Sequence, residues 1–172
     1  MSKLNILNDG ILFINVYSKG QTTLGQNLSN FAHTPFTHPS LGNFNSIEGA
    51  FYYFLTGKIH EQLRLLSGGA AKKEGRRVIP KEWLEESTPI SDRFKQFILE
   101  CIQCKLRTHK QILMQLISTD LPLEHFYVQG EHIVNKEEYR WILDEIDRIR
   151  TVTKEWYINK YGALPNIPLK NS

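Results

Sequence analysis

Residues 44–57 read FNSIEGAFYYFLTG, with one carboxylate at the start of an apolar and aromatic run that ends at a glycine. The run predicts a helix over residues 47–56 that ends at Gly57. Asn45 can be its N-cap, and Glu48 then lies at the third helical position, where a carboxylate reaches back to the cap amide and suits the helix dipole. A first-turn carboxylate among aromatic rings is also partly desolvated, which tunes it for proton transfer. Both interpretations of Glu48 stay open on spacing alone.

The composition is that of a soluble globular protein. The chain has 172 residues, 41% of them hydrophobic and 23% charged, which suits one domain with a sizeable core. Its apolar runs are too short to cross a bilayer, and residues 1–10 lack the apolar core of a signal peptide. Cys101 and Cys104 fit a reducing compartment. We therefore expect a cytoplasmic protein with no membrane partner, and its net charge of +3 permits an anionic ligand without requiring one.

The first half of the chain predicts short elements separated by breakers. Its β-branched, Gly, Pro and Asn content favours, in chain order, a strand over 10–18, a turn over 19–26, an ordered irregular loop over 27–44, a short helix over 59–66 broken by SGGA, a basic helical turn over 70–77 and a helix over 80–87.

The second half predicts longer helices. Apolar residues recur at helical spacing from Ser91 onward, and Thr108 can cap a further helix. Residues 124–134 favour two short strands around a Gln-Gly turn. Asn135 and the acid three residues on have the spacing of a capping box, which predicts a helix that ends at Gly162. Its apolar stripe would consist of Ile142, Ile146, Ile149, Val152 and Trp156.

Together these elements predict a predominantly helical α+β fold with a few short strands. We expect one compact domain over residues 1–172, with a core of about 11–161 and a tail over 163–172.

Four segments in order resemble the NADAR family, also called YbiA-like. They are Leu28-Ser29-Asn30-Phe31, Ser46-Ile47-Glu48, AAKKEGRR at 70–77, and Trp83 in a short helix. The order and spacing fit over about residues 11–150. Two departures concern the substrate: Gly49 and Tyr52 stand where many members have His and Gln, and a late Asp-x-x-Trp-Gly motif is missing.

The resemblance implies a NADAR-like fold and the hydrolysis of N-glycosidic bonds without a cofactor. Family members are associated with ADP-ribose attached to guanine bases and with a ribosylamino-pyrimidine phosphate of riboflavin synthesis. We expect ADP-ribosylated guanine in nucleic acid as the substrate, with the riboflavin intermediate as the alternative. A non-catalytic module that binds ADP-ribose or nucleotides is the alternative from another class.

The chemistry of the reaction suggests roles for particular residues. Cleavage of a C–N glycosidic bond passes through an oxocarbenium-like state, which a carboxylate such as Glu48 stabilises while it accepts a proton from water. Aromatic faces can hold the leaving base, and phosphates need cations or helix N-termini. The remaining candidate substrate-binding residues are Ser29, Asn30, Phe31, Tyr52, Lys72, Lys73, Arg76, Arg77, Trp83, Lys105, Arg107 and Tyr127.

Each candidate also has a simpler explanation. Trp83 suits core packing equally well, Asn30 suits a turn, and clustered cations usually form a solvated surface. Glu124 or His125 could supply a second acid or base, and the sequence does not choose between them.

The two cysteines form a single CxxC in the middle of a predicted helix. A structural zinc site needs four ligands, and the six histidines show no HxxxH or HxH pattern. We expect Cys101 and Cys104 to be core thiols and the chemistry to need no metal.

Overall fold

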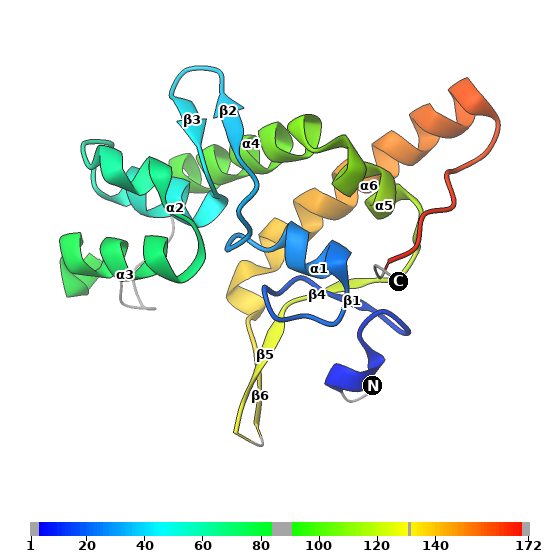
Figure 1. Ribbon diagram of the computed structural model, residues 1–172, viewed down its shortest axis with the longest axis horizontal. Coiled ribbons are helices and arrows are strands. Elements are labelled where there is room, and N and C mark those ends of the chain that lie inside the picture. Colours follow the sequence, from blue (N-terminus) through cyan, green and yellow to red (C-terminus); the bar gives the residue numbers. More distant parts are fainter. Residues whose placement is uncertain (1–3, 84–90, 131, 170–172) are drawn as a thin grey trace. The chain divides into compact units, whose positions relative to one another are not determined.

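The computed structural model describes residues 4–83, 91–130 and 132–169, without the side chain of Trp83. It divides into two compact units: unit 1 consists of the chain up to Ser29 and from His109 onward, and unit 2 is Asn30–Thr108 (Figure 1). The predicted α+β class, mostly helical with a few short strands, is confirmed.

The described part of unit 2 holds a hairpin and three α-helices. Its elements are β2 (Phe36–His38), β3 (Gly42–Phe44), α2 (Ile47–Leu55), the 3₁₀ helix η2 (Glu61–Leu65), α3 (Gly68–Val78), the 3₁₀ helix η3 (Lys81–Trp83) and α4 (Asp92–Thr108). Of the helix expected over 80–87, residues 80–83 lie within the described part, where Lys81–Trp83 form η3; the rest of this prediction lies outside the described residues.

The segment 27–44 is more regular than the irregular loop predicted for it. β2 and β3 pair as an antiparallel hairpin in which Phe36 lies opposite Phe44, and their rings stack with centroids 5.7 Å apart. Gly42 has a φ of 78°, which a glycine adopts without strain. Cross-strand aromatic packing therefore overrides the Pro, Asn and Gly content that favoured a loop.

α2 forms over Ile47–Leu55, and Gly57 follows it at a φ of 69°, as expected. Its N-cap, however, is Ser46 and not Asn45. The Ser46 hydroxyl accepts from the Gly49 N–H at 2.9 Å and donates to the Leu66 carbonyl at 2.9 Å. Glu48 is therefore the second helical residue, and the predicted capping-box contact does not form.

α3 begins where the sequence predicted a break. SGGA opens this helix, with Ser67 at the N-cap position and Gly68 at a φ of 52°. The buried side of this helix is narrow and consists of Ala71 and Gly75. These small side chains let α3 lie close to α2.

α4 provides most of the core of unit 2, as its apolar periodicity predicted. Phe94, Phe97, Ile98, Cys101 and Ile102 are buried along one side of the helix. Phe97 contacts the rings of Phe54 and Phe44, at centroid distances of 5.0 and 6.3 Å. α4 thereby anchors both α2 and the hairpin.

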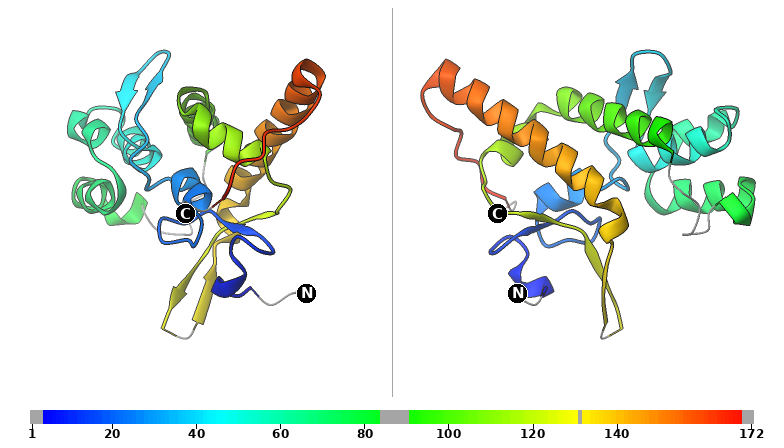
Figure 2. Two further views of the ribbon diagram at one scale, coloured as in Figure 1. Left: turned by 45° about the vertical axis from the view of Figure 1, so that its right-hand side comes forward. Right: turned by 180° about the vertical axis from the view of Figure 1, so that it is seen from behind.

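Unit 1 combines short strands with the longest helix. Its elements are η1 (Ile6–Asn8), β1 (Ile14–Asn15), α1 (Thr23–Leu28), α5 (Lys110–Ile117), β4 (Leu123–Glu124), β5 (Phe126–Gln129), β6 (His132–Asn135), η4 (Glu137–Tyr139) and α6 (Arg140–Tyr161). Figure 2 shows α6 and the β5–β6 hairpin from two further sides.

The strand expected over 10–18 is reduced to the two residues of β1, which pair in parallel with β4. Side chains replace the rest of the ladder. Asp9 accepts from the backbone N–H groups of Asn15 and Gln21, and the Asn15 amide exchanges two hydrogen bonds of 3.1 Å with the backbone of Phe126. Polar side chains, which strand propensity does not register, thus shape this segment.

Helix positions differ from the prediction at three caps. Part of the expected turn over 19–26 is α1, which Thr22 caps by accepting from the Gly25 N–H at 3.0 Å. His109, and not Thr108, precedes α5. Asn135 ends β6, and α6 begins five residues later, because Asn135 bonds Glu137 instead of capping a helix.

The β5–β6 hairpin and the end of α6 at Gly162, with a φ of 81°, are as predicted. The predicted apolar stripe of α6 is buried only in its first part, at Ile142 and Ile146, whereas Val152 and Trp156 are exposed. Within the described residues, none of the helices is long and apolar enough to cross a membrane.

Candidate functional site

Glu48 is a buried carboxyl group in the first turn of α2. Its backbone N–H donates to the Asn30 carbonyl at 2.9 Å, which fixes the start of the helix beside residues 30–31. The residue is 9% exposed, and its carboxylate has no hydrogen-bond or ion-pair partner in the described parts of the chain. A carboxyl group in this state is rare in a protein core, because burial without a partner is costly.

The environment of Glu48 changes its protonation equilibrium. Burial raises the pKa of Glu48 from 4.5 to about 7, and the positive charges of Lys72 and Arg76 act in the opposite direction with smaller effect. At neutral pH the carboxyl group therefore populates both its acid and its base form. A group of this kind can accept and return a proton within one reaction.

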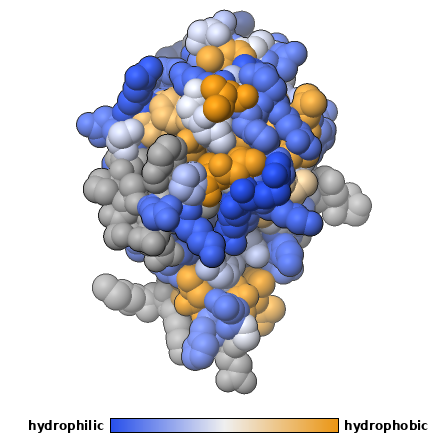
Figure 3. All heavy atoms as spheres, turned by 90° about the vertical axis from the view of Figure 1, so that its left-hand side faces the viewer, coloured by the Kyte–Doolittle hydropathy of each residue, from blue (hydrophilic) through white to orange (hydrophobic). Residues whose placement is uncertain are grey.

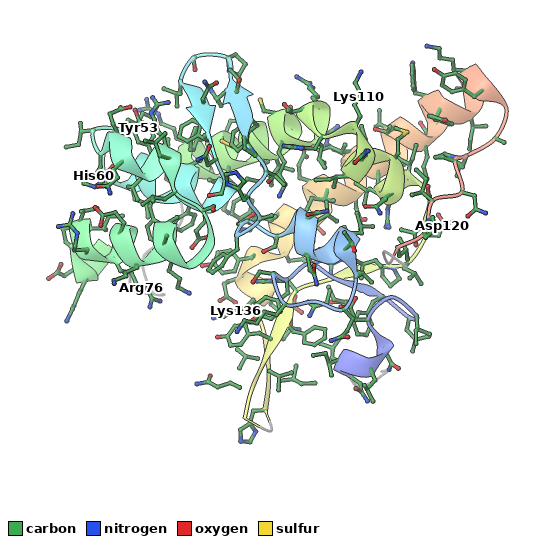
Figure 4. The ribbon with its side chains drawn as sticks, viewed as in Figure 1. Tyr53, His60, Arg76, Lys110, Asp120 and Lys136 are labelled. Carbon is green, nitrogen blue, oxygen red and sulfur yellow. The ribbon has the colours of Figure 1, made fainter. Side chains whose placement is uncertain are left out.

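α3 presents two cations to this carboxyl group. Lys72 and Arg76 are four residues apart and so lie on one side of the helix. The Lys72 ammonium nitrogen is 5.6 Å from the centre of the Phe31 ring, and Arg76 is exposed and extends from α3 (Figure 4). A carboxyl group, an aromatic ring and two cations thus share one region of unit 2.

Within the predicted basic cluster, Lys72 and Arg76 act on Glu48, whereas Arg77 pairs with Glu74. Arg77 holds Glu74 through contacts of 2.6 and 2.9 Å, and His60 contacts the same carboxylate at 2.8 Å. These hydrogen bonds lower the pKa of Glu74 to about 2. Arg77 is therefore occupied by an ion pair, and of the cluster only Lys72 and Arg76 influence Glu48.

Two glycines allow the close packing that fixes the site. A Cβ atom at Gly75 would lie 2.1 Å from the Tyr52 ring, and one at Gly49 would lie 2.4 Å from the Leu63 carbonyl oxygen. The Tyr52 ring is consequently buried against α3, and its role in binding substrate stays a prediction. Because the Leu63 carbonyl leaves no room for a Cβ atom at position 49, only glycine fits directly after Glu48.

The segment 29–31 reaches the site through Asn30 and Phe31. The side-chain amide of half-buried Asn30 makes no hydrogen bond within the described residues, so it can serve a ligand hydroxyl. The Phe31 carbonyl and ring lie beside Gly68 at the start of α3. Ser29 is buried, and its backbone N–H closes α1 by donating to the Gly25 carbonyl.

Lys105 and Arg107 do not form the second surface group of cations that the sequence suggested. Lys105 is 1% exposed in the interior, whereas Arg107 is exposed. Burial lowers the pKa of Lys105 from 10.5 to about 7. Lys105 is therefore partly neutral at physiological pH, unlike a surface lysine that binds phosphate.

Three further candidates belong to unit 1. Tyr127 is half-buried, with its ring centre 6.2 Å from that of Tyr17. Burial raises the pKa of Glu124, and Arg140 at 3.7 Å opposes this shift. Burial also lowers the pKa of His125, whose Nδ1 donates to the Val16 carbonyl at 2.8 Å. The Trp83 side chain lies outside the described residues.

The cysteines are core residues, as predicted. Cys101 and Cys104 are both buried and unpaired, and burial raises the pKa of each thiol. In residues 4–83, 91–130 and 132–169, no three His, Cys, Asp or Glu side chains are grouped so that they could hold a metal ion.

The surface of the α2–α3 side is mixed in character. Figure 3 shows hydrophilic side chains next to a hydrophobic group there. Unit 2 also has a shallow hollow with a mostly apolar lining. It is lined by Leu55, Thr56, Ile59, His60, Val78, Ile79 and Pro80. His60 connects this hollow to Glu74 and not to Glu48.

The sequence indicated Glu48 and its neighbours Asn30, Phe31, Lys72 and Arg76, but not the division of the basic cluster or the close packing of α2 and α3. The separation of Lys72 and Arg76 from Lys73 and Arg77 follows from helical periodicity, so it was open to prediction once α3 was placed. The contact between Gly75 and Tyr52 had only a weak signal, a glycine inside a helix.

Comparison with known proteins adds no assignment: no family model, no curated protein and no solved structure matches the chain.

Proposed function

We propose that this chain is an N-glycosidase that removes ADP-ribose from guanine bases in nucleic acid. The observation that carries the proposal is the buried, unpartnered Glu48 carboxyl group, whose pKa of about 7 suits proton transfer at neutral pH. The resemblance of residues 28–31, 46–48 and 70–77 to the NADAR family supplies the reaction type.

The proposed reaction is a hydrolysis. As the bond between the anomeric carbon and the base nitrogen breaks, its electron pair leaves with the base, and an oxocarbenium-like sugar forms. The ionised Glu48 stabilises this cation and accepts a proton from the attacking water, whose oxygen bonds to the anomeric carbon. The proton then passes to the base nitrogen. The products are ADP-ribose and the restored guanine amine.

The cations of α3 suit a diphosphate. Lys72 and Arg76 supply two positive charges on one helix side, which matches the two phosphates of ADP-ribose. Asn30 offers an amide to ribose hydroxyls, and the Phe31 ring offers a face to a base. The two cations, the Asn30 amide and the Phe31 ring all come from the segments on which the family resemblance rests.

One observation favours the second candidate, hydrolysis of a ribosylamino-pyrimidine phosphate. Because Glu74 occupies Arg77, few cations serve the Glu48 region, and a small phosphorylated metabolite needs no more than one or two. A non-catalytic nucleotide binder is the alternative from another class.

The test is incubation with an oligonucleotide that carries ADP-ribosylated guanine, with release of ADP-ribose followed by mass spectrometry. We expect release by the wild type and by Glu137→Gln, an exposed carboxyl control, and none by Glu48→Gln. Release from the riboflavin intermediate alone would favour the second candidate. Binding of ADP-ribose by wild type and Glu48→Gln alike, without turnover of either substrate, would make the chain a binding module.

A further inference from the structure

The C-terminal turns of α6 carry aromatic side chains that the core of unit 1 does not use. All buried residues of this helix lie between Ile142 and Ile146. Trp156 is 53% exposed and Tyr161 57% exposed, at the end of the helix drawn in orange in Figures 1 and 2. A tryptophan left half in water needs an explanation, because scattered exposed aliphatic residues are common and exposed tryptophans are not.

The exposed rings of Trp156 and Tyr161 form a group with Lys160 and the half-buried Tyr157. The ring centres of Trp156 and Tyr161 are 6.0 Å apart, and those of Tyr157 and Tyr161 are 4.6 Å apart. The Lys160 ammonium nitrogen lies 4.8 Å from the Trp156 ring centre and 5.2 Å from that of Tyr161. These contacts order the rings before any ligand arrives, which lowers the entropy cost of binding. We call Trp156, Tyr157, Lys160 and Tyr161 the α6 aromatic end.

Glu155 and Lys160 are both exposed on these turns, and it is the position of Lys160 among the rings that favours an anionic partner. The other cations of α6 contact carboxylates, in the pairs Arg140–Asp144, Arg148–Glu145, Arg150–Asp147 and Lys154–Asp120. Lys160 differs, since in the described part of the chain it contacts aromatic rings and no carboxylate. Its charge is therefore available to an anion that approaches the rings.

We infer that the α6 aromatic end binds single-stranded nucleic acid. Aromatic faces stack on bases of any sequence, and a neighbouring lysine pairs with the phosphate backbone, which is the combination that single-strand binding surfaces use. Trp and Tyr are also enriched at protein interfaces, but a lysine at the centre of the rings is not, so a nucleic-acid strand fits better than a second protein copy. The inference does not depend on Glu48, since it concerns unmodified strands.

The test measures fluorescence anisotropy of a labelled, unmodified single-stranded 20-mer with the full chain at several salt concentrations. We expect Trp156→Ala to weaken binding on the order of tenfold, the effect of losing one stacked base. Trp156→Phe should retain most of the affinity. Lys160→Ala should lower the slope of log K against log salt by roughly 0.7, the value for one phosphate contact on a single strand.

Val152→Ala is the matched control, because Val152 is also exposed on α6, at 54%, and has neither a ring nor a charge. Because the 20-mer carries no ADP-ribose, its binding is measured apart from hydrolysis, and a failed N-glycosidase proposal leaves this result unaffected. Equal affinity of Trp156→Ala and Val152→Ala, with circular dichroism showing both folded, would overturn the inference. So would a wild-type dimer that Trp156→Ala dissociates without any change in strand affinity.

Discussion

Replacing Glu48 by Gln should make the protein more stable at alkaline pH while removing the proposed N-glycosidase activity. The carboxyl group has a folded pKa of about 7 and an ordinary pKa of 4.5, so the folded state binds the proton more tightly than the unfolded state. Stability therefore falls as the pH rises from about 4.5 to about 7, and stays at the lower level above that range. A pKa difference of roughly 2.5 corresponds to about 3 kcal/mol.

Glutamine at this position would have the same shape and no charge, so this loss should be absent from the variant. Helix capping does not change, because Ser46 and not residue 48 bonds the Gly49 N–H. The loss of a charge near the helix N-terminus costs only about 0.3–1 kcal/mol. Near pH 5 the two proteins should be about equally stable, and near pH 8.5 the variant should be ahead by about 2–3 kcal/mol.

Urea unfolding of both proteins across this pH range, followed by circular dichroism, measures the difference. Every other titrating group is common to the two chains, so its contribution cancels. Parallel curves of unfolding free energy against pH would refute the reasoning, because they would mean that Glu48 titrates normally. A variant that is more stable but releases no ADP-ribose would show that the lost activity is not caused by unfolding.

The same carboxyl group sets the expected pH dependence of catalysis. If ionised Glu48 accepts the proton from water, kcat/KM should rise with pH to a plateau above about 7. Arg76→Gln removes a charge that lowers this pKa, so the midpoint should move to higher pH. Arg77→Gln is the control and should leave the midpoint in place, because Arg77 is paired with Glu74. A midpoint that moves in both variants or in neither would contradict this assignment.

Three other changes test the fold. Lys105→Met should remove a rise in stability between pH about 7 and 10.5, on the order of 5 kcal/mol. The rise is expected because the buried lysine is neutral in the folded state over that range while the unfolded state still binds the proton, and urea unfolding at the two ends measures it. Gly75→Ala would place a Cβ atom 2.1 Å from the Tyr52 ring and should lower the stability by about 1–3 kcal/mol or more. Gly69→Ala, which has open space around it, should stabilise α3 by about 0.5–1 kcal/mol. Thermal melts compare the two variants. Cys101, fully buried with a raised pKa, should react with a thiol reagent only on unfolding, so prompt labelling of the native protein would contradict its place in the core.

The elements that the sequence predicted well are those in which apolar spacing repeats over several turns. α4 shows this best, because Phe94, Phe97, Ile98 and Cys101 recur at helical intervals and are all buried. α2 was also found, since its aromatic run ends at a glycine with a positive φ. In such elements the spacing of apolar residues by itself indicates the helix and its buried side.

The errors lie where a polar side chain or a distant partner decides the conformation. Thr22 caps α1 although the segment 19–26 was predicted as a turn, and Asn15 bonds Phe126, more than a hundred residues away. Asn135 bonds Glu137 where a capping box was expected. Each residue had two compatible hydrogen-bonding roles, and the choice depends on contacts that a single sequence does not show.

The candidate site was predictable in its residues but not in its electrostatics. Glu48, Lys72 and Arg76 all appear in segments chosen from the sequence, and helical spacing alone separates Arg76 from Arg77. The burial that raises the pKa of Glu48 requires α2 and α3 to meet closely, and that approach depends on the absence of a side chain at Gly75.

The position of Glu48 argues for a chemical role because stability does not account for it. Ser46 already caps the helix, so the carboxylate satisfies no backbone donor that would otherwise be lost. Its burial costs about 3 kcal/mol above neutral pH, and glutamine of the same shape would avoid that cost. Lys72 and Arg76 reduce the cost without forming an ion pair, so the pKa stays near 7 instead of falling to the ordinary value. Proton transfer requires a group that titrates near neutral pH, and Glu48 does so although its burial destabilises the fold. The pH dependence of Glu48→Gln is therefore the decisive measurement on this chain.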